Sequence, residues 1–353
     1  MSPWLDRLVG APLLLARRRR PRAACDNPRI LVIRRNRMGD MLCTLPLLHV
    51  LRIHFPEARI TVACDEPGAD VARACPSVDR VIVLNSTWTR RLSPVFNAVR
   101  LQNHDWVLVA KGGFDRRLAR LAPLTHAAVT IGFDPAAPGR SDFYTHPVAL
   151  PADSYLEHQI ETQLRLLGPL EVPAPKFDPD MLRLRLPGTA LQFAREALAR
   201  KPFADHPGFG LINLSSNRPV RFRTEDFVAV IRHLLDTSDL AVGVVGMPHD
   251  RAVLDALARR FPGGRVGALA TPGPLDLAAL LERAAIFLTP EGGAAHLSSA
   301  TQTPTVVMFD APYGKWRPRG PRHVIVEVEA DTGAFSADRV RTAIDSLRAR
   351  AKG

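Results

Sequence analysis

The feature that most constrains the fold is an alternation of short β-branched runs with longer amphipathic stretches, which begins at Ile30 and restarts near Phe209. Short apolar runs separated by helical patterns are typical of a parallel sheet wrapped by helices. The clearest helix is expected over 41–54, where leucines recur at every third position. The strands are expected at 30–33, 58–63, 80–84, 106–110 and 127–131, and then at 209–214, 240–245, 265–269, 286–288 and 305–309. The pattern predicts an α/β protein with two Rossmann-like domains.

A proline-rich segment separates the two series of strands. Residues 169–187 contain five prolines, in a chain of 353 residues that is long enough for two ordinary domains. Proline favours extended chain over helix, so this segment is the expected linker. The expected parts are an N-terminal extension (1–28), a first domain (29–168), the linker (169–187), a second domain (188–335) and a C-terminal helix (336–353), which in two-lobed folds often crosses back to the first domain. Ligands of such folds bind beyond the carboxyl ends of the strands, so we expect a cleft between the two domains.

The N-terminal extension carries most of the net charge. The formal charge of the chain is +12, and residues 1–37 hold ten Arg and two Asp, a net of +8. Apolar residues between Trp4 and Leu15 precede Arg17 to Arg20, which is the reverse of a secretory signal. Apolar side chains followed by arginines suit an anionic lipid surface. Two interpretations stay open for residues 1–22: peripheral contact with the inner face of the cytoplasmic membrane, or a basic extension without a function.

The rest of the composition excludes several other classes of protein. Hydrophobic residues make up 46% and charged residues 23%, which is the balance of a folded globular chain. No basic motif with interleaved aromatic residues is found, so no nucleic-acid partner is expected. Cys25, Cys43, Cys64 and Cys75 form no Cys-x-x-Cys pair, which argues against a zinc or redox site. No apolar run reaches the roughly 20 residues that span a bilayer, and we expect a cytoplasmic protein.

The turn after the first strand contains a candidate catalytic carboxylate. Its single glycine, Gly39, does not match the three-glycine fingerprint of dinucleotide binding, so a nicotinamide cofactor is not expected. Asp40 stands at the start of the helix that follows. There its carboxylate can act either as a helix cap or as a general base that takes a proton from a bound hydroxyl.

The second series contains a candidate phosphate site after the strand at 286–288. Gly292 and Gly293 leave backbone N–H groups free at the start of a helix, where an anion such as a pyrophosphate is favoured. His296, one turn later, can donate to the same phosphates. Taken singly, the glycines suit an ordinary turn and the histidine suits a buried packing position. Together they indicate a phosphate site, and no plausible carboxylate cluster for a divalent metal accompanies them.

Two separated motifs resemble the heptosyltransferase family, glycosyltransferase family 9. Residues 30–46 resemble its opening, in which a strand leads to Gly-Asp and then to Thr-Leu-Pro. Residues 289–311 resemble its second signature, in which an acidic residue, a small residue, Gly, two further residues and His precede a helix and a Pro-Thr-Val-Val strand. The resemblance continues at 310–312, 315–318 and 158–168, and it spans residues 30 to about 325.

The resemblance implies a GT-B fold and an inverting transfer of a heptose-type sugar, without a metal or other cofactor. The implied donor is a nucleotide sugar such as ADP-heptose, and the implied acceptor is a lipid-linked glycan such as the lipopolysaccharide core. Asp40 falls at the position of the family's proposed general base. Arg221 matches a basic residue that neutralises the donor phosphates, and Ser215 and Ser216 match hydroxyl residues that touch phosphate. Asp250 lies where the family often has an acidic residue for the ribose, although a helix cap is an equally good interpretation.

Departures from the family pattern leave the donor sugar and the acceptor open. Glu291 stands where an Asp is common, and Gly292 stands where a Thr or Ser is usual, which removes one hydroxyl donor to phosphate. Arg37, Lys111 and Arg116 are candidates for contact with an anionic acceptor, and a solvated basic face explains them equally well. Two further hypotheses stay open: a nucleotide-sugar epimerase or hydrolase on the same fold, and a non-catalytic nucleotide-sugar-binding protein.

Overall fold

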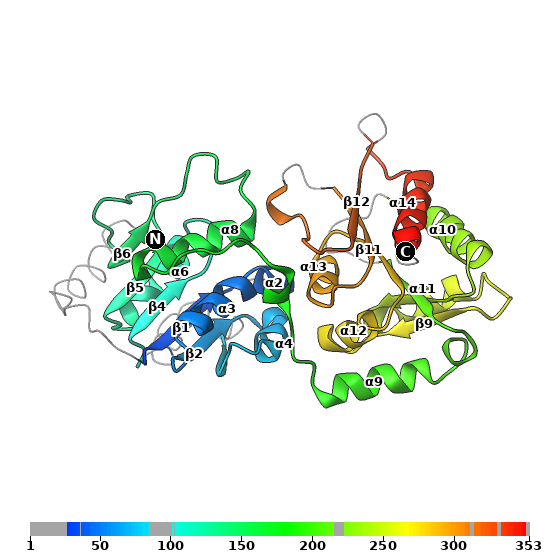
Figure 1. Ribbon diagram of the computed structural model, residues 1–353, viewed down its shortest axis with the longest axis horizontal. Coiled ribbons are helices and arrows are strands. Elements are labelled where there is room, and N and C mark those ends of the chain that lie inside the picture. Colours follow the sequence, from blue (N-terminus) through cyan, green and yellow to red (C-terminus); the bar gives the residue numbers. More distant parts are fainter. Residues whose placement is uncertain are drawn as a thin grey trace. The chain divides into compact units, whose positions relative to one another are not determined.

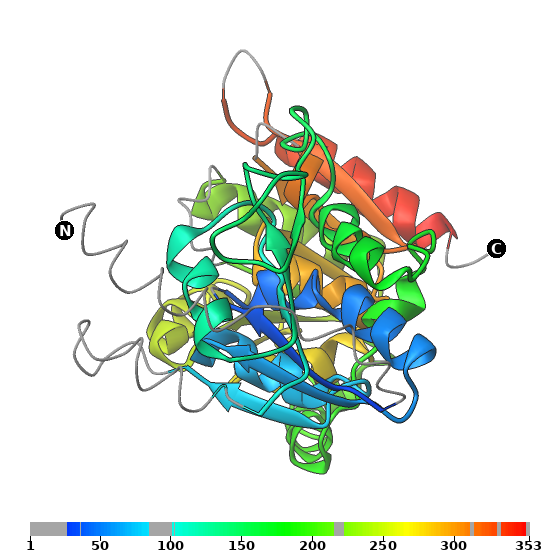
Figure 2. The same cartoon turned by 90° about the vertical axis from the view of Figure 1, so that its left-hand side faces the viewer.

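The chain divides into two compact units, which are described separately. The computed structural model describes residues 27–35, 37–84, 101, 103–214, 222–310, 314–329 and 333–350. Unit 1 spans Met1–Met181 and unit 2 spans Leu182–Gly353 (Figures 1 and 2). The boundary between the units falls within the segment expected to be the linker, 169–187. The N-terminal extension, with the membrane contact expected of residues 1–22, lies outside the described residues.

Unit 1 is a six-stranded parallel sheet with helices. Its strands are β1 (Arg29–Arg34), β2 (Arg59–Cys64), β3 (Arg80–Val83), β4 (Trp106–Val109), β5 (Val129–Phe133) and β6 (His146–Val148). Its helices are α2 (Met38–Leu42), α3 (Leu45–His54), α4 (Glu66–Ala74), α6 (Arg116–Ala119), α7 (Leu121–Leu124), α8 (Gln159–Leu164) and the 3-10 helix η1 (Arg165–Leu170), and the 3-10 helix η2 (Pro179–Leu182) lies at the unit boundary. The strand order is β3-β2-β1-β4-β5-β6, the doubly wound order, whose direction reverses between β1 and β4. We call this place the switch point of unit 1.

Alternation along the strands of unit 1 sends one set of side chains to each face of its sheet. Leu31 and Ile33 of β1 share a buried cluster with Val107 and Val109 of β4. The same cluster contains the buried residues of α6 and α7, so these two short helices cover that face of the sheet. The strands are held in place by apolar packing, and their carboxyl ends meet at one edge of the sheet.

The helix expected over 41–54 is two helices, α2 and α3. α2 already begins at Met38, and the break falls at Cys43 and Thr44, just before Pro46. Proline lacks the N–H that would donate to the carbonyl of Leu42, and its ring would clash with that carbonyl in a continuous helix. Asp40 is therefore the third residue of a five-residue helix and lies in its first turn.

Unit 2 repeats the doubly wound order. Its strands are β7 (Phe209–Asn213), β8 (Ala241–Gly246), β9 (Val266–Ala270), β10 (Ile286–Pro290), β11 (Thr305–Phe309) and β12 (His323–Glu327). Its helices are α9 (Gly188–Leu198), α10 (Thr224–Thr237), α11 (Arg251–Ala258), α12 (Pro274–Leu281), α13 (Gly293–Ala300) and α14 (Ala337–Arg350), with the 3-10 helices η3 (Phe203–Asp205), η4 (Pro248–Asp250) and η5 (Gly314–Trp316). The parallel sheet has the order β12-β11-β10-β7-β8-β9, so the switch point of unit 2 lies between β7 and β10.

The C-terminal helix α14 completes the core of unit 2. Its buried residues Val340, Ile344 and Leu347 recur at helical spacing and join one large cluster with α10, α11 and alternate residues of β10 and β11. α13 covers the opposite face of that sheet, where Ala295 packs against Val307. In Figure 1, α14 (red) lies beside α10 (yellow-green).

The expected strands are present, with bounds that differ by up to two residues, and two strands were not expected. β6 contains Pro147 and β12 begins with His323, and both are edge strands whose residues are mostly half-buried. Edge strands carry a weaker apolar pattern than central strands, which explains why the sequence did not predict these two. Over the described part of the chain, no helix is both long enough and apolar enough to cross a membrane.

Candidate active site

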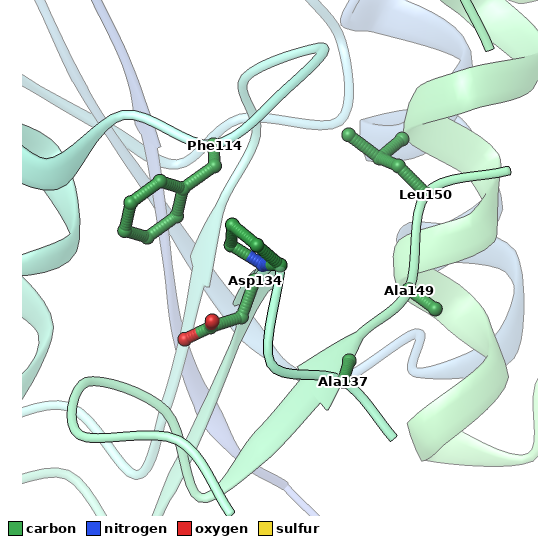
Figure 3. Close-up of a pocket in the computed structure, with 6 residues that line it drawn as sticks. Phe114, Asp134, Ala137, Ala149 and Leu150 are labelled. Atoms are coloured by element: carbon green, nitrogen blue, oxygen red, sulfur yellow. The ribbon is translucent and has the colours of Figure 1, made fainter. Parts of the chain in front are cut away.

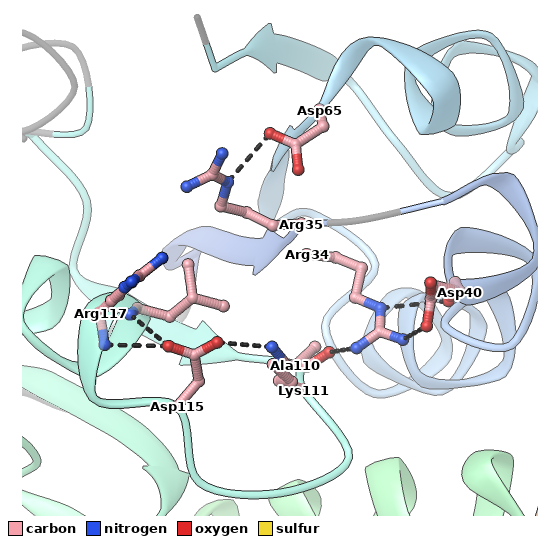
Figure 4. Close-up of polar contacts among 9 residues, drawn as sticks. Arg34, Arg35, Asp40, Asp65, Ala110, Lys111, Asp115 and Arg117 are labelled. Carbon is pink, nitrogen blue, oxygen red and sulfur yellow. Dashed lines mark hydrogen bonds and ion pairs between the residues drawn. The ribbon is translucent and has the colours of Figure 1, made fainter. Parts of the chain in front are cut away.

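A buried arginine occupies the switch point of unit 1. Arg34 ends β1 and is only 2% exposed. Its Nη2 donates to Asp40 Oδ1 at 2.5 Å, its Nε to the Asp40 carbonyl at 3.2 Å and its Nη1 to the Ala110 carbonyl at 2.8 Å (Figure 4). Burial lowers the pKa of Arg34, while the negative charge of Asp40 raises it. A guanidinium is tolerated in the interior because its charge is paired and its N–H groups are hydrogen-bonded.

Asp40, the candidate base, is held at both carboxylate oxygens. Oδ1 accepts from Arg34, and Oδ2 accepts from the backbone N–H of Arg37 at 3.1 Å, which is the bond of a helix cap. The side chain is 15% exposed, so it lies at the edge of the unit with part of its surface open. The cap that the sequence suggested is thus present, and the carboxylate has in addition a buried cation behind it.

The candidate acceptor residues of unit 1 differ in their contacts. Lys111 follows Ala110, and its Nζ donates to Asp115 Oδ2 at 2.5 Å (Figure 4). Asp115 caps α6, where its Oδ1 accepts from two backbone N–H groups. Burial raises the pKa of Asp115, but the hydrogen bonds from Lys111 and from these amides outweigh it and the pKa is lowered. Arg116 and Arg37 are exposed.

A pocket lies where the loops after β4, β5 and β6 meet (Figure 3). Phe114 and Leu150 contribute apolar surface, and Asp134 is a further lining residue. Asp134 Oδ1 accepts from the N–H of Ala136 at 2.9 Å, and its Oδ2 accepts from Ser141 Oγ at 2.5 Å. The carboxylate of Asp134 therefore holds the loop after β5 in place, and the pocket has an aromatic ring on its wall at the carboxyl edge of the sheet. The full lining is Phe114, Asp134, Pro135, Ala137, Ala149 and Leu150.

A neutral pair bridges the switch point of unit 2. Asn213 ends β7, and its Nδ2 donates to Thr289 Oγ1 of β10 at 3.1 Å. Both side chains are buried, and Thr289 Oγ1 in turn donates to the carbonyl of Pro290 at 3.0 Å. This pair fastens the two central strands side by side just before the candidate phosphate site.

The candidate phosphate site is the turn between β10 and α13. The N–H of Glu291 donates to the Met308 carbonyl at 2.8 Å, which ties the start of the turn to β11. Gly292 is the N-cap residue of α13, and its φ of 143° lies in a region that L side chains rarely adopt. Gly293 opens the eight-residue helix, and His296 lies buried one turn inside it. The first N–H groups of a helix have no partner within it, so this turn can bind an anion.

The other predicted donor residues are either cap residues or outside the described residues. Asp250 follows β8, and its Oδ2 accepts from the N–H of Met247 at 2.9 Å, so it caps η4. Asp250 therefore acts as a helix cap in the structure, and its contact with a ribose stays a prediction. Ser215, Ser216 and Arg221 lie outside the described residues.

The thiols and carboxylates of the described residues form no metal cluster. Cys43, Cys64 and Cys75 are buried thiols, and burial raises the pKa of Cys64 to about 12 and that of Cys75 to about 11. No group of three or more His, Cys, Asp or Glu side chains within the described ranges could hold a metal ion. Asp178 and Asp180 do have the spacing of an Asp-x-Asp pair, but Asp178 Oδ1 accepts from the N–H of Asp180 in a local turn.

Two residues at the switch points were not predicted from the sequence, Arg34 and Asn213. The available signal was position: each is a polar residue at the end of a strand whose other side chains are mostly apolar. Arg34 directly follows the apolar run from Ile30 to Ile33, and a charged residue that is buried there needs a partner of opposite charge.

Comparisons with known proteins identify the family. The model of glycosyltransferase family 9 (heptosyltransferase) matches residues 93–340, which include the second motif, while the first motif precedes the matched span. A search of curated proteins found no match.

Solved structures with the same fold include several heptosyltransferases. A family 9 glycosyl transferase from Veillonella parvula aligns with a TM-score of 0.75 and 18% identity over 92% of this chain and 97% of its own. Escherichia coli heptosyltransferase WaaC with ADP-2-deoxy-2-fluoro heptose aligns with a TM-score of 0.68 and 20% identity, over 90% of this chain and 99% of its own. Escherichia coli ADP-heptose lps heptosyltransferase II aligns with a TM-score of 0.70 and 15% identity, over 92% and 100%.

The two doubly wound units and these likenesses establish the GT-B fold. The family match covers well over half of the residues. The chain therefore belongs to glycosyltransferase family 9, the heptosyltransferase family, and is a glycosyltransferase.

Proposed function

We propose that this chain transfers a heptose-type sugar from ADP-heptose to a hydroxyl of a lipid-linked glycan such as the lipopolysaccharide core, with inversion and without a metal. The observation that carries the proposal is the glycine turn at the start of α13, which follows β10 beside the switch point of unit 2. The family match supports it, and so do solved relatives that hold ADP or an ADP-heptose analogue.

Unit 2 is the donor side in this proposal. The leaving ADP gains negative charge as the glycosidic bond breaks, and that charge must be met by fixed positive groups. The helix start at Gly292 and Gly293 supplies N–H groups, and His296 and Arg221 are proposed to supply further donors to the diphosphate. Glu291 is proposed to contact the sugar, and Asp250 the ribose.

Unit 1 supplies the base. The carboxylate of Asp40 takes the proton of the acceptor hydroxyl while that oxygen forms a bond to the anomeric carbon. The bond from the anomeric carbon to the ADP oxygen breaks, and its electron pair leaves with ADP. Because attack comes from the face opposite ADP, the configuration of the anomeric carbon is inverted.

The acceptor is proposed to lie on the loops of unit 1. Arg37, Arg116 and Lys111 offer positive charge for a phosphorylated or carboxylated glycan. The pocket beside Phe114 offers an aromatic ring, against which the apolar face of a sugar ring can pack. Residues 1–22 are proposed to hold the enzyme at the inner face of the cytoplasmic membrane, where a lipid-linked acceptor is found.

Mass spectrometry of a defined reaction tests the proposal. The protein is incubated with ADP-heptose and a truncated lipopolysaccharide core, with and without EDTA. We expect the acceptor to gain the mass of one heptose in both samples and the new linkage to have the inverted configuration by NMR. No mass gain would exclude the donor and acceptor pair, and loss of activity with EDTA would exclude metal independence.

The same reaction separates the two alternatives. Free heptose or an epimerised nucleotide sugar without acceptor gain would indicate the hydrolase or epimerase, and unchanged reactants with bound nucleotide would indicate a binding protein. Neither alternative is favoured, because the family model that matches is that of the heptosyltransferases. Deletion of residues 1–25 tests the membrane proposal: we expect the shortened protein to stay folded and to leave anionic vesicles, and continued vesicle binding would refute it.

A further inference from the structure

We propose that Arg34 is a positioning residue for Asp40. Its buried guanidinium fixes the carboxylate of the candidate base and ties it to the end of β4, from which the loop of Lys111 begins. This inference rests on the proposed function, in which Asp40 takes the proton of the acceptor hydroxyl. It concerns a residue that touches neither donor nor acceptor in that proposal and that acts through Asp40.

The guanidinium of Arg34 holds Asp40 at two places and a neighbouring strand at a third. Nη2 donates to the carboxylate oxygen Oδ1, and Nε donates to the backbone carbonyl of the same residue. Nη1 donates to the carbonyl of Ala110, the residue directly after β4 (Figure 4). The planar guanidinium presents its N–H groups in a fixed fork, so these three acceptors are held in one geometry. The side chain and the peptide of Asp40 therefore cannot turn independently of the sheet.

Helix capping alone does not explain this arrangement, because two aspartates of unit 2 make the same cap without a buried arginine. Asp226 is the third residue of α10 and accepts from the N–H of Arg223 at 3.0 Å. The Arg223 side chain that pairs with it is 83% exposed, against 2% for Arg34. Asp250 caps η4 through the N–H of Met247. The cap at Asp40 needs only the N–H of Arg37, so the buried guanidinium serves something else.

The burial of Arg34 beside Asp40 costs free energy of folding and fixes the orientation of the Asp40 carboxylate. Taking a guanidinium and a carboxylate out of water costs several kcal/mol per ion, and an apolar residue at the end of β1 would avoid that cost. What the pair adds is a fixed orientation for a carboxylate that keeps 15% of its surface exposed. A proton acceptor works only within hydrogen-bond reach and in the right direction, and a displacement of about 1 Å can slow a reaction about 100-fold.

The test compares Arg34→Lys with Arg35→Lys. Lysine keeps the positive charge, but its single ammonium cannot reach all three acceptors of Arg34. Arg35 is the next residue of the same turn and pairs with Asp65 at 2.9 Å, on a contact that does not involve Asp40 (Figure 4). We expect Arg34→Lys to lower kcat by about 10- to 100-fold with the KM for ADP-heptose and the Kd for ADP within about twofold. Arg35→Lys is expected to keep kcat within about twofold, and equal kcat in the two variants would overturn the proposal.

A double-mutant cycle shows whether Arg34 acts through Asp40. In the Asp40→Asn background, Arg34→Lys should cause no further loss of kcat, because the group that it positions has been removed. A further loss as large as in the wild-type background would overturn the proposal. Arg34→Gln serves in the same cycle if Arg34→Lys fails to fold, as judged by circular dichroism.

A second measurement does not depend on activity. The amide proton of Arg37 donates to Asp40 Oδ2, so its hydrogen exchange reports whether the carboxylate is held. Exchange should be faster in Arg34→Lys and unchanged in Arg35→Lys, and unchanged exchange in Arg34→Lys would overturn the proposal. Failure of the wild-type enzyme to use ADP-heptose would instead count against the proposed function, because the exchange measurement needs no donor.

Discussion

Unit 1 and unit 2 have the same strand order, and in each the last residue of the first strand bonds across the switch point. In unit 1 this residue is Arg34, whose guanidinium reaches the Ala110 carbonyl after β4. In unit 2 it is Asn213, whose amide reaches Thr289 in β10. The first bridge is an ion pair between a guanidinium and a carboxylate, whereas the second joins two neutral side chains.

The turns beside the two bridges also differ: the turn of unit 1 presents a carboxylate, and the turn of unit 2 presents backbone N–H groups. The turn after β1 leads into α2, a helix of only five residues whose third residue is Asp40. The turn after β10 leads into α13, an eight-residue helix that begins at Gly293 and has Gly292 as its N-cap. A fixed carboxylate suits proton transfer, and a helix start with glycines suits an anion. One strand order thus carries two different candidate sites, because the residues at its switch point differ.

Replacement of the carboxylate should have the largest effect. Asp40→Asn removes the base but retains an oxygen that can accept a hydrogen bond, so we expect kcat to fall by about 100- to 10,000-fold. The Kd for ADP should be unchanged, since the donor is assigned to unit 2. Steady-state kinetics and calorimetric titration with ADP give these values. Asp65→Asn, which removes the partner of Arg35, is the matched control. An unchanged kcat in Asp40→Asn would leave this residue only its role as a helix cap.

Removal of the buried cation should weaken unit 1 more than any change at the bridge of unit 2. Arg34→Met removes the cation that pairs with the carboxylate of Asp40. We expect the free energy of unfolding to fall by about 3 kcal/mol, the lower end of the range for a broken buried ion pair, because Asp40 is partly exposed. Hydrogen exchange resolved by unit measures the loss. Slower or unchanged exchange in unit 1 would contradict the view that the pair holds the switch point together.

A side chain at the glycine turn should weaken unit 2 and its anion site together. Gly292 has a φ of 143°, so Gly292→Ala strains the backbone by about 1–3 kcal/mol. We expect a lower free energy of unfolding and a higher Kd for ADP. Gly293→Ala is the control for stability, because Gly293 has no such φ and lies within the helix. Equal stability of the two variants would show that the turn does not require glycine at 292.

Acid should affect unit 2 through His323, a half-buried histidine of β12. Burial lowers the pKa of His323 from 6.5 to about 4. The unfolded chain then binds the proton more readily than the folded chain, so this contribution to stability is complete above pH 6.5 and is lost as the pH falls towards 4. The expected loss is about 1.4 kcal/mol per pH unit in that window. Unfolding by urea at several pH values measures it, and His323→Gln should reduce the slope. Parallel slopes for the two proteins would refute the assignment.

The smallest effect is expected at the neutral bridge. Asn213→Ala removes the neutral hydrogen bond from Nδ2 to Thr289 Oγ1, which contributes about 1 kcal/mol, and Thr289 keeps its bond to the Pro290 carbonyl. The free energy of unfolding should therefore fall by less than in Arg34→Met, measured in the same way. A larger loss at Asn213 than at Arg34 would reverse the comparison between the two switch points.

Much of the fold could be predicted from the sequence because its strands and helices follow from local patterns. The apolar run from Ile30 to Ile33 and the leucines of α3 have the spacing of a buried strand and an amphipathic helix. The edge strands β6 and β12 lack such a pattern, since part of each faces solvent. The break before Pro46 was not predicted, although a proline disrupts a continuous helix because it lacks the N–H of the helical hydrogen bond.

The sequence by itself determined which residues stand in the turns after β1 and β10, because a turn, a glycine pair and a helix start are set by neighbours along the chain. Those patterns were sufficient to indicate Asp40, Gly292, Gly293 and His296. Only the tertiary structure decided what lies behind Asp40. Arg34 and Ala110 are 76 residues apart in sequence, and they meet because β1 and β4 are adjacent in the sheet. A contact that depends on the order of the strands in a sheet cannot be predicted from the residues near it in the sequence.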